Sequence, residues 1–342
     1  MPHHTVLVTG ATGYIARHIV HQLLEAGHAV VGSVRDMDYE DELRAALGGA
    51  LQDPAALERL TVVYLDLNAD TGWPEAMEGV DVVMHVASPV PDGYKPITDD
   101  YITTAIDGTH RACRFAYAAG IRRIIVTSSI AAIMGAPDRE EGTLFTEAHW
   151  CDDTRPELNA YSRSKVLSER AFWAWKDAEG PEAQATSINP AFVVGPSIGT
   201  AKIPSSLNIV GRLMTGHDKG LADLTLPYVD VRDVARMHVL AMDMPQTVGR
   251  RYISSDAALS FQEVAEVLRA LYPEHPIPSR VLPRFLVRLA GLVKPEAKAL
   301  ATAWGNSYPM SQERAKAEMG MSFMPAVASL QESAHFLVSN DM

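Results

Sequence analysis

The stretch Thr5-Val6-Leu7-Val8-Thr9-Gly10-Ala11-Thr12-Gly13-Tyr14-Ile15-Ala16 decides the fold. It opens with a short apolar run, which predicts a buried strand, and a helix with a regular apolar face follows the second glycine. Gly10 permits a tight turn, Gly13 lets the backbone approach a pyrophosphate group, and Ala16 lets helix and strand pack closely. Strand, glycine turn and helix in this order predict a dinucleotide-binding start, here with the spacing Gly-x-x-Gly-x-x-Ala.

Apolar runs alternate with helical segments from this first strand to Pro196. Strands are expected at residues 5–9, 28–34, 61–67, 80–89, 122–129 and 185–196. Such alternation predicts a parallel sheet with helices on both faces. The fold class is therefore α/β, a Rossmann-type doubly wound parallel sheet with a smaller, mainly helical C-terminal substrate lobe.

The domain organisation follows from where this alternation weakens. Residues 1–195 are predicted to form the dinucleotide-binding domain, and residues 226–256 are predicted to return to it. Residues 196–225 and 257–342 are predicted to form the substrate-binding lobe. The stretch from about 196 to 226 is predicted to be a lid or a substrate loop. Another helix is expected to open at Tyr228-Val229-Asp230-Val231.

Composition limits the partners. The chain has 342 residues and a net charge of -12, which argues against nucleic acid and against an anionic membrane. No stretch approaches the roughly 18 apolar residues of a membrane span, and the N-terminus lacks the pattern of a signal peptide. The two cysteines, Cys113 and Cys151, match no zinc or redox spacing. We therefore expect no metal site, and we expect the protein to be cytoplasmic.

The end of the second strand bears on the choice of cofactor. Val34-Arg35-Asp36 stands where an NAD enzyme often carries an acid for the adenosine ribose. Arg35 can instead pair with a 2′-phosphate, which favours NADP over NAD. The acidic residues between Asp36 and Glu42 weaken that argument, and a solvated arginine is the alternative interpretation.

Three further strand ends carry candidate ligand-binding groups. Asp66 and Leu67 can flank an adenine, or simply close the strand with a turn. Small residues after His85 leave room for a cofactor backbone, whereas His85 itself is interpreted as structural. Ser128 and Ser129 present hydroxyls at the tip of a central strand, where one can hydrogen-bond a substrate oxygen or serve a local turn.

Tyr161-Ser162-Arg163-Ser164-Lys165 supplies a candidate for proton transfer. The tyrosine and the lysine lie four residues apart, on the same face of a predicted helix. A phenol has a pKa of about 10, and a nearby ammonium is expected to lower it toward the working range. Taken alone, the pair also arises by chance as a structural feature.

Six motifs in this order resemble the extended short-chain dehydrogenase/reductase family. Within it they resemble the branch of dihydroflavonol reductase, cinnamoyl-CoA reductase and aldehyde or ketone reductases. The similarity runs from about residue 5 to residue 255. The motifs are residues 9–16, 34–36, 85–89, 127–129, 161–165 and 190–196.

The resemblance implies NADPH-dependent reduction of a carbonyl group. Tyr161 would donate a proton to the carbonyl oxygen, Lys165 would bind the nicotinamide ribose and lower the pKa of the tyrosine, and Ser129 would orient the carbonyl. The residues implied in cofactor binding are Gly10, Thr12, Gly13, Tyr14, Ile15, Arg35, Asp66, Leu67, Val86, Ala87, Ser88, Thr127, Ser128, Tyr161, Lys165, Pro190, Ala191 and Val193. Those implied in substrate binding are Ser88, Val90, Ser129, Met134, Tyr161, Phe192, Ile203 and Tyr228.

The substrate and the rival functions depend on the segment after Ser129. Met134 is apolar where plant dihydroflavonol reductases commonly carry a polar residue, so a hydrophobic or aromatic aldehyde or ketone is expected. Residues 130–134 contain no carboxylate, which argues against a sugar dehydratase. The alternatives are a hydroxysteroid dehydrogenase, a nucleotide-sugar epimerase and a non-catalytic NADP-binding sensor. The chain is expected to be a monomer or a homodimer.

Overall fold

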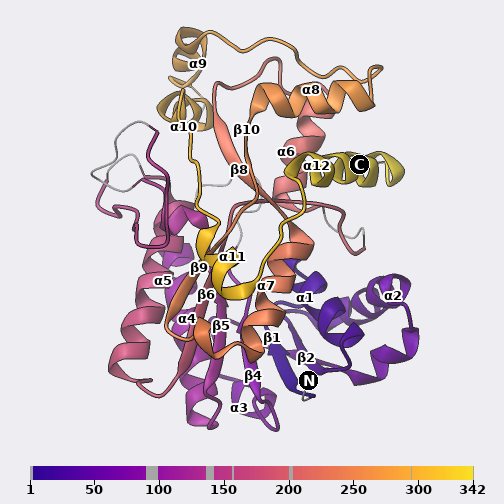
Figure 1. Cartoon of the computed structure of the whole chain (residues 1–342), viewed down its shortest axis with the longest axis vertical. Helices are drawn as coiled ribbons and strands as arrows, with labels where there is room; N and C mark the ends of the chain where they lie inside the picture. Colours follow the sequence, from indigo (N-terminus) through magenta and orange to yellow (C-terminus); the bar gives the residue numbers. More distant parts are fainter. Residues whose placement is uncertain are drawn as a thin grey trace.

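Seven parallel strands form the central sheet of the computed structural model, in the order β3-β2-β1-β4-β5-β6-β9 (Figure 1). The structure describes residues 3–89, 99–135, 142–155, 158–199, 203–293 and 295–341. The strands are β1 Thr5–Val8, β2 Ala29–Val34, β3 Leu60–Tyr64, β4 Val82–His85, β5 Arg123–Thr127, β6 Gln184–Pro190 and β9 Arg250–Ser254. The order reverses between β1 and β4, and ligands of open α/β sheets bind at the carboxyl ends of such strands.

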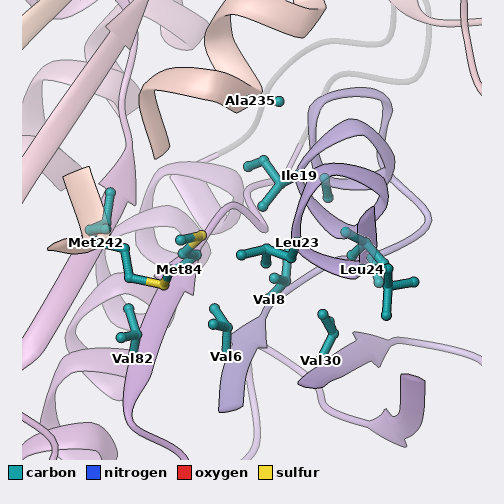
Figure 2. Packing of buried hydrophobic residues seen from close by; sticks show 14 of the residues in the cluster. Val6, Val8, Ile19, Leu23, Leu24, Val30, Val82, Met84, Ala235 and Met242 are labelled. Atoms are coloured by element: carbon teal, nitrogen blue, oxygen red, sulfur yellow. The ribbon is translucent and has the colours of Figure 1, made fainter. Parts of the chain in front are cut away.

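Helices pack on both faces of this sheet and create two apolar cores. On one face, α1 Tyr14–Glu25, α2 Glu40–Ala50 and α7 Val231–Asp243 bury their apolar sides against the sheet. Figure 2 shows this packing around the first strand and the first helix. On the other face lie α3 Trp73–Ala76, α4 Asp99–Ala118 and α5 Ala160–Ala178. The predicted doubly wound fold is confirmed.

A smaller part of the molecule lies beyond the carboxyl ends of the strands (Figure 1). Its three-stranded sheet consists of β10 Ala258–Ser260, β8 Thr225–Asp230 and β7 Phe192–Val194. Helices α6 Ser205–Met214, α8 Phe261–Leu271 and α12 Ala326–Ser339 share an apolar core with it. Helices α9 Arg284–Ala290 and α10 Pro295–Ala303 also lie in this part, whereas α11 Glu313–Met319 packs against β9 and α7 of the larger part. The C-terminal region is mainly helical, as predicted, and no helix among the described residues is long and apolar enough to cross a membrane.

The structure corrects three details of the predicted elements. Tyr228 lies in a strand rather than at a helix start, because it pairs with Phe192 of β7, and the helix begins only at Val231. The single strand expected at 185–196 is interrupted at Ala191, because β6 pairs with β5 and β9 whereas β7 pairs with β8, so its two halves join different sheets. The segment expected as a loop contains α6.

Candidate active site

The glycine turn after β1 brings the backbone close to the end of β4. Gly10 has a φ of +69°, and a Cβ at this position would lie 3.1 Å from the Cα of Ala87. Its N–H donates to the hydroxyl of Ser33 at 3.0 Å, which fixes the turn against β2. Helix α1 follows with Gly13 as its N-cap, and no described side chain caps it. Its N-terminal turn therefore presents backbone N–H groups and a positive dipole end, which suit a phosphate group.

Thr9 holds the ends of β1 and β4 together. Its hydroxyl oxygen accepts hydrogen bonds from the N–H groups of Val86 and Ala87, both at 3.0 Å, and contacts Nδ1 of His85 at 3.0 Å. Burial lowers the pKa of His85 to about 4, so the imidazole is neutral at pH 7. His85 is structural, as interpreted from the sequence.

The predicted catalytic side chains meet at the ends of β4 and β5. Asn159 caps α5, since its side chain accepts a hydrogen bond from the N–H of Ser162 at 2.8 Å, and this cap fixes where the helix begins. Tyr161 lies in the first helical turn, and the hydroxyl of Ser129 lies near enough to act on the pKa of its phenol. Lys165 follows one turn later, and its Nζ donates to the hydroxyl of Ser88 at 2.9 Å.

The electrostatics of this pair differ from the expectation. Burial raises the pKa of the Tyr161 phenol, and the hydrogen bond with Ser129 only partly opposes that rise. Nζ of Lys165 lies 5.8 Å from the centre of the tyrosine ring and points to Ser88 instead. Burial also lowers the pKa of Lys165 to about 8. The expectation that Lys165 lowers the pKa of Tyr161 is therefore wrong for this geometry.

The two serines at the tip of β5 have different partners. The hydroxyl of Ser128 donates to the carboxylate of Glu169 at 2.6 Å, on the buried side of α5. Ser129 instead faces Tyr161, and its hydroxyl accepts a hydrogen bond from the N–H of Ala131 at 3.1 Å. Only Ser129 faces the predicted proton donor, which agrees with the role implied for it.

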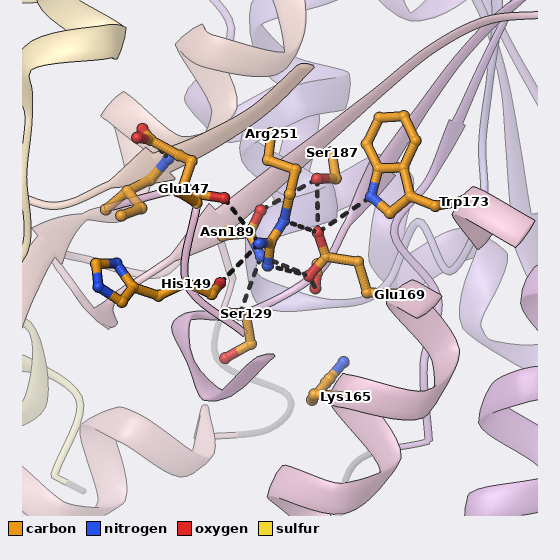
Figure 3. Close-up of polar contacts among 12 residues, drawn as sticks. Ser129, Glu147, His149, Lys165, Glu169, Trp173, Ser187, Asn189 and Arg251 are labelled. Atoms are coloured by element: carbon orange, nitrogen blue, oxygen red, sulfur yellow. Dashed lines mark hydrogen bonds and ion pairs between the residues drawn. The ribbon is translucent and has the colours of Figure 1, made fainter. Parts of the chain in front are cut away.

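A buried polar network, absent from the sequence-based predictions, surrounds Glu169 (Figure 3). Its carboxylate accepts hydrogen bonds from Ser187 at 2.8 Å and from the side-chain amide of Asn189 at 2.7 Å. Arg251 of β9 forms an ion pair with it at 2.8 Å. The one available signal was the position of Glu169, four residues after Lys165 on the same helix face.

The remaining predicted cofactor residues lie around the same edge of the sheet. Arg35 is exposed directly after β2. The carboxylate of Asp66 closes a turn after β3 by accepting a hydrogen bond from the N–H of Asn68 at 2.8 Å. Thr127 hydrogen-bonds to His238 at 2.8 Å, and the hydroxyl of Tyr14 donates to the carbonyl of Gly195 at 2.6 Å.

The predicted substrate residues fall into two apolar clusters. Met134 and Val193 pack on the cluster that contains Ile130 and Phe145. Phe192 and Ile203 pack on a second cluster, where the ring of Phe192 contacts Tyr228 edge-on with the ring centres 5.2 Å apart. Val90 lies outside the described residues.

Comparison with known proteins identifies the family. The sequence profile described as "NAD dependent epimerase/dehydratase family" matches residues 6–253. The chain belongs to this family. That assignment, with the reductases it resembles, confirms the predicted extended short-chain dehydrogenase/reductase family and its cinnamoyl-CoA reductase-like branch.

Relatives within the NAD dependent epimerase/dehydratase family are named as reductases. Cinnamoyl-CoA reductase 1 of Petunia hybrida is 34% identical, with 96% of this chain and 93% of the relative covered. A putative NADPH-dependent methylglyoxal reductase of Candida albicans is 32% identical, with 79% of this chain and 83% of the relative covered. The solved structure of yeast methylglyoxal/isovaleraldehyde reductase Gre2 with NADPH superposes with a TM-score of 0.79, at 24% identity, over 98% of this chain and 99% of that one. At that identity, the superposition supports the fold alone.

Proposed function

We propose that this chain is an oxidoreductase that reduces the carbonyl group of an aldehyde or a ketone with NADPH. The observation that carries the proposal is the placement of Ser129 beside Tyr161, with Lys165 one turn away, next to the glycine turn of a dinucleotide-binding fold. The names of the relatives, which include an NADPH-dependent reductase and several cinnamoyl-CoA reductases, support the same reaction class.

The residues around the glycine turn fit NADPH. A Cβ at Gly10 would contact Ala87, and one at Gly13 would lie 3.1 Å from the carbonyl of Gly10, so both positions favour the absence of a side chain. The first turn of α1 would hold the pyrophosphate, and Arg35 would pair with the 2′-phosphate at the end of β2. Tyr161 and Lys165 would hold the nicotinamide ribose. When bound, NADPH supplies the hydride.

The proton that the carbonyl oxygen receives would come from the phenol of Tyr161. Because burial raises its pKa, the phenol carries its proton at neutral pH, so a proton is present for donation although the phenol is a weaker acid than in water. Ser129 orients the carbonyl oxygen toward this hydroxyl. Transfer of the proton from the tyrosine to that oxygen completes an alcohol and leaves a phenolate, which the neighbouring hydroxyl of Ser129 stabilises.

The substrate side favours an apolar carbonyl compound. Ile130 and Ala131, directly after Ser129, are buried, and Met134 and Val193 add a partly buried apolar surface beside them. Residues 130–134 offer no acid for dehydration. A hydrophobic or aromatic aldehyde or ketone therefore fits this surface better than a nucleotide sugar does.

A carbonyl panel tests the proposal. Loss of NADPH absorbance is measured with aromatic aldehydes, α-ketoesters, bulky ketones, a cinnamoyl thioester and a dihydroflavonol, and each assay is repeated with NADH. We expect turnover that favours NADPH, and we expect Arg35→Ala to narrow that preference. Arg59→Ala is the matched control, because Arg59 directly precedes β3, at the end of the sheet away from Arg35. This substitution should leave the preference for NADPH over NADH unchanged. No turnover on any carbonyl despite tight NADPH binding would contradict the proposal.

A further inference from the structure

Glu169 shares a buried polar site with Lys165. The two residues lie one turn apart on the same face of α5, and their exposed fractions are only 2% and 7% (Figure 3). Both line a cavity of about 10 Å³, which Ser88 and Ser128 also line, enough space for about one water molecule. A carboxylate and an ammonium that line the same buried cavity interact more strongly than they would in water.

The carboxylate of Glu169 is tied to the backbone of Ser129. The side-chain amide of Asn189 donates to Glu169 at 2.7 Å and to the carbonyl of Ser129 at 3.1 Å. Ser128 donates to the same carboxylate at 2.6 Å. The position of Ser129, which faces Tyr161, thus depends on Glu169 through two separate contacts.

Arg251 holds the carboxylate in its charged form. Burial by itself would raise the pKa of Glu169, but Arg251 and the surrounding hydroxyls keep it below its ordinary value. The guanidinium donates to the carbonyls of Glu147 at 2.9 Å and His149 at 2.8 Å and lies 3.8 Å from the centre of the Trp150 ring. The arginine is therefore fixed in place, and so is the carboxylate.

We propose that Glu169 is a positioning residue that fixes Ser129 and acts as the buried counter-charge that keeps Lys165 protonated. That Glu169 contributes to catalysis rests on the proposed function. That it fixes Ser129 and keeps Lys165 charged does not. His85 faces Lys165 from β4 and is neutral at pH 7. Tyr161 faces it from α5 with a protonated phenol, and Arg251 of β9 lies behind the carboxylate. Glu169 is the group that opposes the effect of burial on Lys165.

The test is the titration of Lys165 in the substrate-free protein. The chain contains eight lysines, so protein labelled with [ε-¹³C]lysine gives a small set of NMR signals, and Lys165→Arg identifies the relevant one. We expect Glu169→Gln to lower the pKa of Lys165 by about one unit or more. Trp173→Phe is the matched control, because it removes a 3.4 Å hydrogen bond to the same carboxylate without removing the charge. Its titration should match that of the wild type.

A second variant keeps the test valid if Glu169→Gln leaves Arg251 unpaired and unfolds the chain. Glu169→Gln combined with Arg251→Gln removes both charges, and we expect its Lys165 pKa to lie between those of the wild type and the single variant. An unchanged Lys165 pKa in a folded variant would overturn the proposal. The titration needs no substrate, so it distinguishes this failure from a failure of the reductase assignment. If turnover is measurable, Glu169→Gln should also shift its pH profile, which a purely structural role would not do.

Discussion

Replacing Gly10 by alanine tests whether the glycine turn shapes the cofactor site. The backbone at Gly10 has a φ of +69°, and an L-residue in that region costs about 1–2 kcal/mol. The added Cβ would also lie 3.1 Å from both Cα and Cβ of Ala87, a contact that the backbone can relieve only by moving. Together these effects should lower the free energy of unfolding by about 2–3 kcal/mol. For a chain of this size, the melting temperature should fall by about 3–4 °C.

The same movement should weaken cofactor binding, because it separates the glycine turn from the end of β4. We expect the Kd for NADPH, measured by fluorescence titration, to rise about tenfold or more. Gly49→Ala is the matched control, since Gly49 is exposed in α2 with nothing within 4 Å of a Cβ. It should raise stability by about 0.5–1 kcal/mol and leave the Kd unchanged. A Gly10→Ala protein that melts and binds NADPH like the wild type would refute this reasoning.

Two further predictions concern stability. His18, His85 and His238 are buried with pKa values lowered by burial to about 4, so as pH falls through 6.5 the unfolded chain takes up protons that the folded chain does not. The free energy of unfolding should therefore fall as the pH is lowered from about 6.5 to about 4, by about 1.4 kcal/mol per pH unit for each histidine. Denaturant titrations that give the same free energy of unfolding across this pH range would contradict this. Trp73→Ala should cost about 3–5 kcal/mol, because the side chain is fully buried and its ring nitrogen donates to the carbonyl of Asp66 at 3.1 Å. Thermal unfolding checks that loss, with Trp73→Phe expected to lose less.

The first strand and helix could be predicted because their signals are local. The apolar run at 5–9 and Gly10 need no distant partner to be read, and the same holds for Asn159 at the start of α5. By contrast, β9 could not be predicted as a strand, because it begins with two arginines and its pairing partner β6 lies far back in the chain. The break at Ala191 has the same cause, since the two halves pair with β9 and β8, which both lie later in the chain.

The site shows the same division. The sequence predicted that Tyr161 and Lys165 share a helix face, and they do. It could not predict that Lys165 is buried, or that the surroundings of the partly buried Tyr161 raise the pKa of its phenol instead of lowering it. The ion pair between Glu169 and Arg251 joins residues 82 positions apart, so only the folded chain brings them together.

The most direct measurement compares NADPH binding and turnover in Tyr161→Phe, on the best substrate from the carbonyl panel. The account predicts that the variant binds NADPH nearly as the wild type does, while kcat falls by about 10²–10⁴-fold. Tyr64→Phe, which removes the hydroxyl of an exposed tyrosine, should change neither quantity. A Tyr161→Phe protein that retains wild-type kcat would contradict the assignment of Tyr161 as the proton donor.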